Sequence, residues 1–159
     1  MTTTGTAERR AIRTFAELDH EDLAAGMDRL HALGEALATM PVDQQAAGVR
    51  RVLQWVDADL RPHMAWEESW LFPEIDARAG SQSATSFVRL DHEQISAQAD
   101  RVQSHATRGN DARSHETASL IADLSGLETL LRANVEREER LILPMLEPEA
   151  ERWEPEWRD

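Results

Sequence analysis

Apolar residues recur at alternating steps of three and four along four long segments of the chain, the spacing expected for the buried face of an α-helix. These segments are rich in Ala, Leu, Glu and Arg, which favour helix by intrinsic propensity. Turn-forming and helix-breaking residues separate them at 40–41, 79–81 and 108–111. The pattern predicts helices over about 8–39, 43–78, 82–107 and 111–146. Pro62 and Pro73 fall inside the second helix and predict a kink or an interruption there.

Short connections between long helices place consecutive helices side by side in opposite directions. The predicted fold is therefore an all-α, antiparallel, up-down-up-down four-helix bundle over residues 1–146. Residues 147–159 form an acidic segment that contains Trp153, Trp157 and two prolines, and we expect a short C-terminal tail that caps one end of the bundle.

Polar residues interrupt each apolar face, and these interruptions belong to an internal repeat. The sequence Leu-Asp-His-Glu occurs at 18–21 and again at 90–93, and the segment 63–73 is echoed at 134–144, each about 71 or 72 positions downstream. A duplicated half that keeps its ionisable residues predicts two similar helical hairpins facing a shared core.

The lengths of the helices predict which polar residues meet. His20 and His63 each lie about 30 Å from the turn at Pro41, at 1.5 Å per helical residue, so they should reach the same level. In the second half, His92 lies about 25 Å and Asn134 about 36 Å from the turn at Gly109, a mismatch that slack in the connection must absorb. A single histidine on an apolar face is most often a hydrogen-bonded core residue, but three at one level indicate metal ligands.

The chemistry of this level also favours a metal ion. Burying Glu67 or Glu138 as an isolated carboxylate costs on the order of several kcal/mol. No Lys or Arg falls on the apolar faces nearby, where it could pair with either glutamate. Imidazole and carboxylate together suit iron, manganese or zinc. The two glutamates occupy equivalent places in the repeat, which favours a bridging role between two ions.

Other polar residues near this level are assigned simpler roles. Asp19 and Asp91 are expected to be solvated or to support ligands, and Glu68 and Glu139 to lie on a solvated helix face. Three further histidines lie far from the predicted level and are interpreted as residues of the surface or of the edge of an apolar face: His31, His105 and His115. We interpret Trp66 and Trp70 as core residues, with Trp70 on the apolar face of the second helix and Leu141 on that of the fourth.

Composition narrows the range of functions. The 159 residues include no cysteine, which excludes disulfides and thiolate metal sites, and no tyrosine, which excludes a tyrosyl radical in this chain. A net charge of −13 disfavours nucleic acids and anionic membranes as partners. No segment has the roughly 20 apolar residues of a membrane span, and the N-terminus lacks the apolar stretch of a secretory signal, so we expect a cytoplasmic protein.

The ordered motifs resemble those of the hemerythrin-like, or HHE cation-binding, domain. The resemblance runs from about residue 14 to 146 and consists of Asp-His-Glu, His-x3-Glu-Glu-x3-Phe-Pro, a second Asp-His-Glu, and Glu-Glu-x4-Pro. It implies a four-helix bundle with a non-haem di-iron centre that binds O2 or reacts with O2, peroxide or nitric oxide. The ligands that it implies are His20, His63, Glu67, His92 and Glu138.

Two positions depart from the family pattern. Asn134, at best a weak ligand or a supporting residue, stands where the family normally has a histidine, and Ser96 stands where O2 carriers have a second histidine in the third helix. The reduced ligand set favours a sensor or protective protein over a bulk O2 carrier. Two alternatives remain: an oxygen-activating enzyme that acts on a small organic substrate, and a metal-free bundle that serves as an interaction module. The sequence decides neither the enzymatic activity, the metal, nor the oligomeric state.

Overall fold

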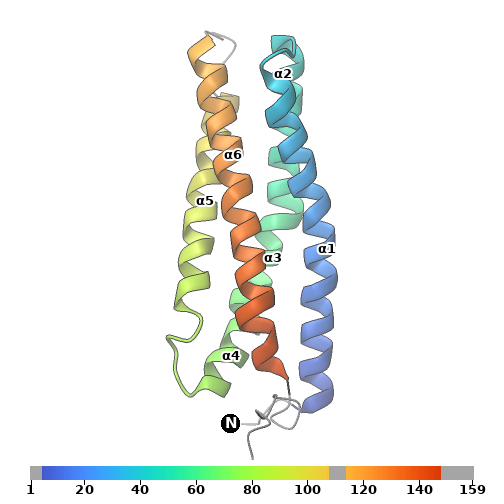
Figure 1. The fold of residues 1–159 in the computed structure, drawn as a ribbon, viewed down its shortest axis with the longest axis vertical. Coiled ribbons are helices and arrows are strands. Elements are labelled where there is room, and N and C mark those ends of the chain that lie inside the picture. The colour runs from blue at the N-terminus through green and yellow to red at the C-terminus, as the bar shows by residue number, and fades with distance from the viewer. Residues whose placement is uncertain (1–4, 108–113, 148–159) are drawn as a thin grey trace, which may run out of the picture.

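The computed structural model describes residues 5–107 and 114–147, and this part of the chain forms an all-α four-helix bundle (Figure 1). The first helix is α1 (Thr6–Leu37) and the third is α5 (Ser86–Thr107). The second is a continuous helical segment made of α2 (Val42–Trp55), η1 (Val56–Leu60), α3 (Arg61–Trp66), η2 (Glu67–Leu71) and α4 (Phe72–Ala79). The fourth consists of α6 (Ser114–Arg137), η3 (Glu138–Ile142) and η4 (Leu143–Leu146).

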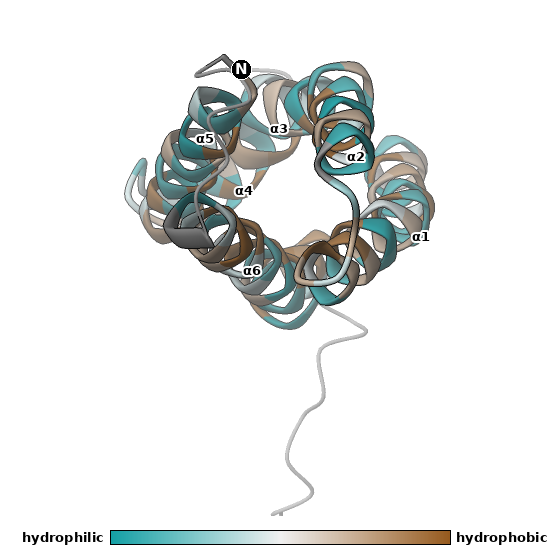
Figure 2. Ribbon diagram, turned by 90° about the horizontal axis from the view of Figure 1, so that it is seen from above, coloured by the Kyte–Doolittle hydropathy of each residue, from teal (hydrophilic) through white to brown (hydrophobic). Residues whose placement is uncertain are grey.

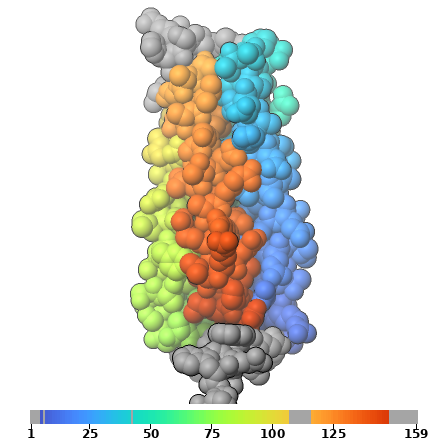
Figure 3. Space-filling view, viewed as in Figure 1, coloured from blue at the N-terminus to red at the C-terminus, as the bar shows by residue number. Residues whose placement is uncertain are grey.

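The helices run alternately up and down and surround a shared interior, toward which their hydrophobic residues face (Figures 1 and 2). Each helix packs against its two neighbours in the order α1, α2–α4, α5, α6 and back to α1. On the face seen in Figure 3, α6 lies between α5 and α1 along the bundle. The predicted fold class is confirmed. The predicted turn at Gly109 and residues 148–159 of the predicted tail lie outside the described residues.

The predicted helix boundaries agree with the structure to within a few residues. Gly80 ends α4 in the left-handed conformation at φ +65°, as expected for a helix C-terminus. The third helix begins later than predicted, at Ser86, because Asp76 accepts hydrogen bonds from the backbone and hydroxyl of Thr85 and holds the preceding turn.

The prolines inside the helices are accommodated by π turns, and the helices continue through them. The segments η1, η2 and η3 are π-helical, and each ends two residues before a proline: Pro62, Pro73 and Pro144. The residue before each proline donates its N–H to the carbonyl five residues back. Since proline lacks an N–H and its ring crowds the preceding turn, a wider turn relieves the crowding without breaking the helix.

The core contains two apolar clusters that are separated along the bundle axis. The upper cluster, toward the α1–α2 connection, includes Leu23, Leu30, Leu60, Leu124 and Leu131. The lower cluster, which we define by its eight buried members, comprises Ala16, Leu71, Phe72, Ile75, Val88, Ile142, Leu143 and Leu146. Along each helix, the predicted polar interruptions fall between members of the two clusters.

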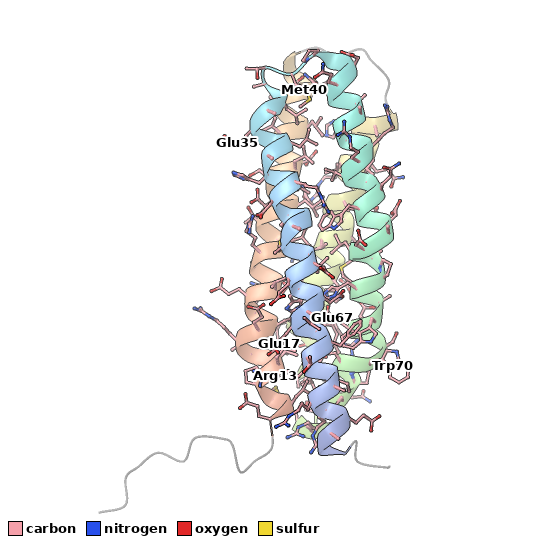
Figure 4. The ribbon with its side chains drawn as sticks, turned by 90° about the vertical axis from the view of Figure 1, so that its right-hand side faces the viewer. Arg13, Glu17, Glu35, Met40, Glu67 and Trp70 are labelled. Atoms are coloured by element: carbon pink, nitrogen blue, oxygen red, sulfur yellow. The ribbon has the colours of Figure 1, made fainter. Side chains whose placement is uncertain are left out.

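The apolar faces differ from the prediction after the π turns. Trp70 and Leu141, both expected on the buried face, are 65% and 54% exposed, and Figure 4 shows Trp70 pointing away from the bundle. Leu71 and Ile142 are buried in their place. Each wider turn delays the return of the chain to the core by one residue, which a constant helical period does not anticipate.

Within residues 5–107 and 114–147, no helix combines the length and apolar character that crossing a bilayer requires.

Candidate metal centre

Five side chains from all four helices meet in the layer between the two apolar clusters. The Nε2 atoms of His63 (α3) and His92 (α5) lie 3.2 and 3.3 Å from Oε2 of Glu67 (η2). Nε2 of His20 (α1) lies 3.3 Å from Oε2 of Glu138 (η3), and Nε2 of His92 lies 3.5 Å from the other oxygen of Glu138. The structure therefore brings together all five residues that the sequence predicted as ligands. The connection between α5 and α6, which was expected to absorb unequal helix lengths, lies outside the described residues.

Most of the polar atoms that face the interior of this cluster are buried and lack hydrogen-bond partners. The five side chains belong to residues with exposed fractions of 0–4%. The three histidine Nε2 atoms, both oxygens of Glu67 and Oε2 of Glu138 have no hydrogen-bond partner. In the described part of the chain, the two glutamates form ion pairs with histidines and with no arginine. Buried polar atoms without partners are costly. Neutral imidazoles and carboxylates converging in this way fit a divalent or trivalent cation.

Four of these residues form an especially compact set. His20, His63, Glu67 and Glu138 each present one donor atom, and these four atoms lie within 4.8 Å of one another. Such a spacing matches one ion held from three sides of the bundle, because α1, the α3–η2 segment and η3 all contribute.

Acidic residues contact the outer nitrogens of the three histidines. Asp19 Oδ2 lies 2.5 Å from His63 Nδ1, and Glu68 Oε1 lies 3.0 Å from His92 Nδ1. Glu139 Oε1 lies 3.4 Å from His20 Nδ1, a looser contact without hydrogen-bond geometry. A carboxylate on Nδ1 fixes the tautomer and leaves the lone pair of Nε2 facing inward.

The roles of Glu68 and Glu139 were missed in the sequence, which predicted a solvated face for both. They are about half exposed, as expected, but their carboxylates reach across to a histidine of the other half of the repeat. Their duplication in the two Glu-Glu pairs was the signal that both positions matter. Asp19 supports a ligand, which is one of the two roles expected for it.

The fourth place in this arrangement lacks an imidazole. Asn134 is 2% exposed and donates a hydrogen bond from Nδ2 to Glu138 Oε1 at 2.8 Å. Asp91, the counterpart of Asp19 in the repeat, is bound by two nitrogens of Arg137, each at 2.8 Å. Around this layer, the structure thus contains three such histidine–carboxylate contacts. At the fourth equivalent place, Asn134 stands instead of a histidine and the carboxylate of Asp91 is bound by Arg137.

The electrostatics reflect the crowding of charge. Burial alone lowers the pKa of His20 and of His92, but the nearby carboxylates of Glu138 and Glu67 outweigh burial and raise the pKa of each to about 10. The pKa of His63 is also raised, because Glu67 and Asp19 outweigh burial. Burial acts to raise the pKa of Glu67, yet the three histidines hold it well below its usual value. Imidazole protons here balance the carboxylates, so a metal cation binding in their place releases protons.

Both glutamates begin a π turn, which connects the local backbone to the site. Glu67 is the first residue of η2 and Glu138 the first of η3, each six residues before a proline. The wider turn directs Glu67 and Leu71, or Glu138 and Ile142, to the interior in succession. The Glu-Glu-x4-Pro spacing therefore fixes where a carboxylate can enter the core above an apolar layer.

Two of the three histidines that were predicted to lie away from this level, His31 and His105, do so. His31 Nδ1 contacts Glu128 at 3.1 Å on the surface, and His105 Nε2 contacts Asp123 at 2.8 Å. The side chain of His115 lies outside the described part of the chain.

Two surface hollows that are lined by described residues adjoin the ligands. One, of about 460 Å³, lies beside the His63–Asp19 pair and has aromatic walls that include Phe15, Trp55 and Trp66. The other, of about 410 Å³, lies beside His92 and includes Ser96. Neither is lined by Asn134 or Trp70, where a substrate pocket was expected under the enzyme alternative.

Comparison with known proteins yields one family. Residues 12–146 match the family model described as the Hemerythrin HHE cation binding domain. Neither the curated proteins nor the solved structures provide a match to this chain.

Proposed function

Because the chain belongs to the hemerythrin HHE cation-binding family, we propose that it holds non-haem iron, two ions in the complete site, in the layer between its apolar clusters. The residues that would hold the metal are His20, His63, Glu67, His92 and Glu138. The observation that carries this proposal is the convergence of their buried donor atoms without hydrogen-bond partners, and with no arginine of residues 5–107 and 114–147 paired to either glutamate. Glu67 and Glu138 occupy equivalent places in the repeat, and Glu67 faces three histidines and Glu138 two, which supports a bridging role.

Iron with unfilled coordination positions supplies the binding and reduction of a small oxidant such as O2, peroxide or nitric oxide. The protein supplies orientation and a dry environment. Asp19 and Glu68 hold the imidazoles of His63 and His92 with Nε2 inward. Phe72, which is fully buried, packs its ring 5.2 Å from that of His92 and separates the layer from solvent below.

A sensor or protective role is favoured over bulk O2 transport. Reversible transport requires a stable reduced centre with a full set of imidazoles. Here Asn134 is directed to Glu138, and Ser96 lines a hollow beside His92. Both positions leave the second half of the site with fewer nitrogen donors, which favours reaction with an oxidant over its storage.

A second candidate function is oxygen activation for a small organic substrate. The hollow of about 460 Å³ beside His63 supports it, because aromatic walls and nearby carboxylates suit a molecule larger than a diatomic. Phe15 is 49% exposed on this wall, so Phe15→Ala should reduce turnover of such a substrate without changing the iron content. An unchanged turnover in this variant would remove the hollow as the substrate site.

The test is elemental analysis of anaerobically purified protein, with visible spectra recorded before and after O2. We expect about two irons per chain and an absorption change on oxidation. One iron, or zinc, would revise the number or identity of the ions. A colourless protein that contains no metal and is unaffected by chelators would overturn both metal-based functions and leave an interaction module.

A matched pair of variants shows whether the metal is in this layer. Glu67→Gln removes a charged oxygen ligand and should abolish iron retention. Glu136→Gln makes the same chemical change on the side chain of a residue that is 60% exposed and paired with Arg140, and it should leave iron content unchanged. Equal iron contents in the two variants would place the metal elsewhere.

A further inference from the structure

We infer that the two metal positions are inequivalent, with one ion held tightly by the compact four-residue set and a second held weakly beside His92. This inference rests on the proposed function, since it concerns how the same site fills. It goes beyond it by assigning an order of filling, and by identifying Arg137 as the residue that keeps Asp91 from orienting a ligand at the second position.

The first position has a full set of free donors. Nε2 of His20, Nε2 of His63, the oxygens of Glu67 and Oε2 of Glu138 are all buried without hydrogen-bond partners. They belong to the set whose donor atoms lie within 4.8 Å of one another. His63 is further oriented by Asp19 at 2.5 Å. An ion placed among these atoms would therefore break no hydrogen bond between protein groups. It would displace only the imidazole protons that face the carboxylates.

The second position has fewer donors, and one of them is already engaged. His92 is the single imidazole on this side. Two glutamate oxygens face its Nε2: Glu67 Oε2 at 3.3 Å, which also faces His63 of the first position, and Glu138 Oε1 at 3.5 Å. Glu138 Oε1 accepts the hydrogen bond from Asn134 at 2.8 Å. An ion bound there must compete with that hydrogen bond for the oxygen, and it gains at most a weak carbonyl ligand from Asn134 in return.

The surroundings of Asn134 are adapted to the missing imidazole. In the first half of the repeat, Asp19 orients His63. In the second half, their counterparts are Asp91 and Asn134, and Asp91 is instead bound by both Nε and Nη2 of Arg137 at 2.8 Å. Such two-point arginine–carboxylate contacts are strong and directional. Arg137 occupies the repeat position of Trp66 in the first half, so no equivalent cation competes for Asp19.

The order of filling is tested by titrating metal-free protein with Fe(II) under anaerobic conditions, followed by calorimetry and elemental analysis. We expect two binding steps whose dissociation constants differ by at least tenfold. Two steps of equal affinity would overturn the inequivalence and leave the proposed function intact. The absence of any binding would overturn both.

The residues are tested with the matched variants Asp19→Asn and Asp91→Asn. Asp19→Asn should weaken the first ion by about 10–100-fold, the effect typical of losing the carboxylate that orients a metal-binding histidine. Asp91→Asn should leave both affinities within about threefold, a fraction of that typical loss, because it orients no imidazole. Equal losses in the two variants would overturn the assignment. Thermal unfolding of the metal-free variants separates these effects from misfolding.

A gain of binding provides the sharper test of Arg137. The double variant Asn134→His with Arg137→Gln should tighten the second ion at least tenfold, because Asp91 is then free to orient the new imidazole. Asn134→His alone should do so less. The control adds Arg140→Gln to Asn134→His, which removes an exposed arginine of the same segment, and should match Asn134→His alone. If the single variant already gives the full gain, Arg137 has no part in weakening the position.

Discussion

The upper apolar cluster and the polar layer below it are held together by different forces, although the same four helices build both. In the upper cluster, residues such as Leu30, Leu124 and Leu127 are at most 1% exposed and pack against one another, so burial itself stabilises the bundle. In the polar layer, Glu67 and Glu138 are equally buried, and their partners among the described residues are histidines and, for Glu138, the amide of Asn134. The difference teaches that stability and metal binding are assigned to separate levels of one core.

The largest expected effect tests the lower apolar boundary of the layer. Leu71→Ala should lower the free energy of unfolding by about 2–5 kcal/mol, because it opens a cavity in a fully buried cluster. Its neighbour Trp70 is 65% exposed, so Trp70→Ala should change that free energy by less than about 0.5 kcal/mol, although it removes a larger side chain. Denaturant unfolding of the two variants measures the difference. A reversed order would mean that the π turn does not set the register of the buried face.

Removing the metal tests the layer itself. Chelation should lower the free energy of unfolding by about 2.7 kcal/mol when the free metal had been at 100 times its dissociation constant. This corresponds to a fall in Tm of roughly 5–10 °C for a chain of this size. Calorimetric scans before and after chelation measure it, with Glu67→Gln as the control that should show no fall. An equal fall in the control would assign the effect to the chelator.

A buried polar residue in the upper part of the bundle sharpens the contrast. Gln98 is 6% exposed and donates from Nε2 to the backbone carbonyl of Asp123 at 2.8 Å, which links α5 to α6 without any metal. Gln98→Ala should lower the free energy of unfolding by about 1–2 kcal/mol, since it removes a buried hydrogen bond. Iron content should not change. A loss of iron in this variant would show that the two levels are coupled.

The smallest effect on stability is expected for a surface histidine. His31 contacts Glu128 with a side chain that is 58% exposed, and such pairs contribute about 0–1 kcal/mol. His31→Ala should therefore leave both stability and iron content close to those of the unaltered protein, whereas His63→Ala should lose iron. Elemental analysis of the two variants compares them directly. Loss of iron in both would mean that histidine number, rather than position, governs retention.

The sequence was a good guide wherever one helix period governed the outcome. Apolar residues at steps of three and four were predicted to form the buried face of the first helix, and Leu23, Met27 and Leu30, which follow those steps, are all buried. The prediction failed at Trp70 and Leu141, each three residues after a buried glutamate. The π turns η2 and η3 change the helical period at those points. Proline marked each place, but it predicted a kink and not a continuous, wider turn.

The five candidate ligands were predicted from the sequence because ionisable residues that recur on the apolar faces of a repeat indicate a shared binding site in the core. What the pattern did not contain was the partner of each side chain. Glu68 and Glu139 look solvated along their own helices, yet each reaches a histidine on another helix. The sequence likewise did not predict that Asp91 binds Arg137, whereas its counterpart Asp19 contacts an imidazole.

The sequence alone determined the all-α bundle, the level at which its polar residues meet, and the donor set available to a metal, because helix period and chain length fix these. Tertiary structure decided which carboxylate orients which imidazole and which oxygen of Glu138 stays free. These outcomes depend on distances between helices, and such distances are set by packing across the whole core and not by the periodicity of any one segment.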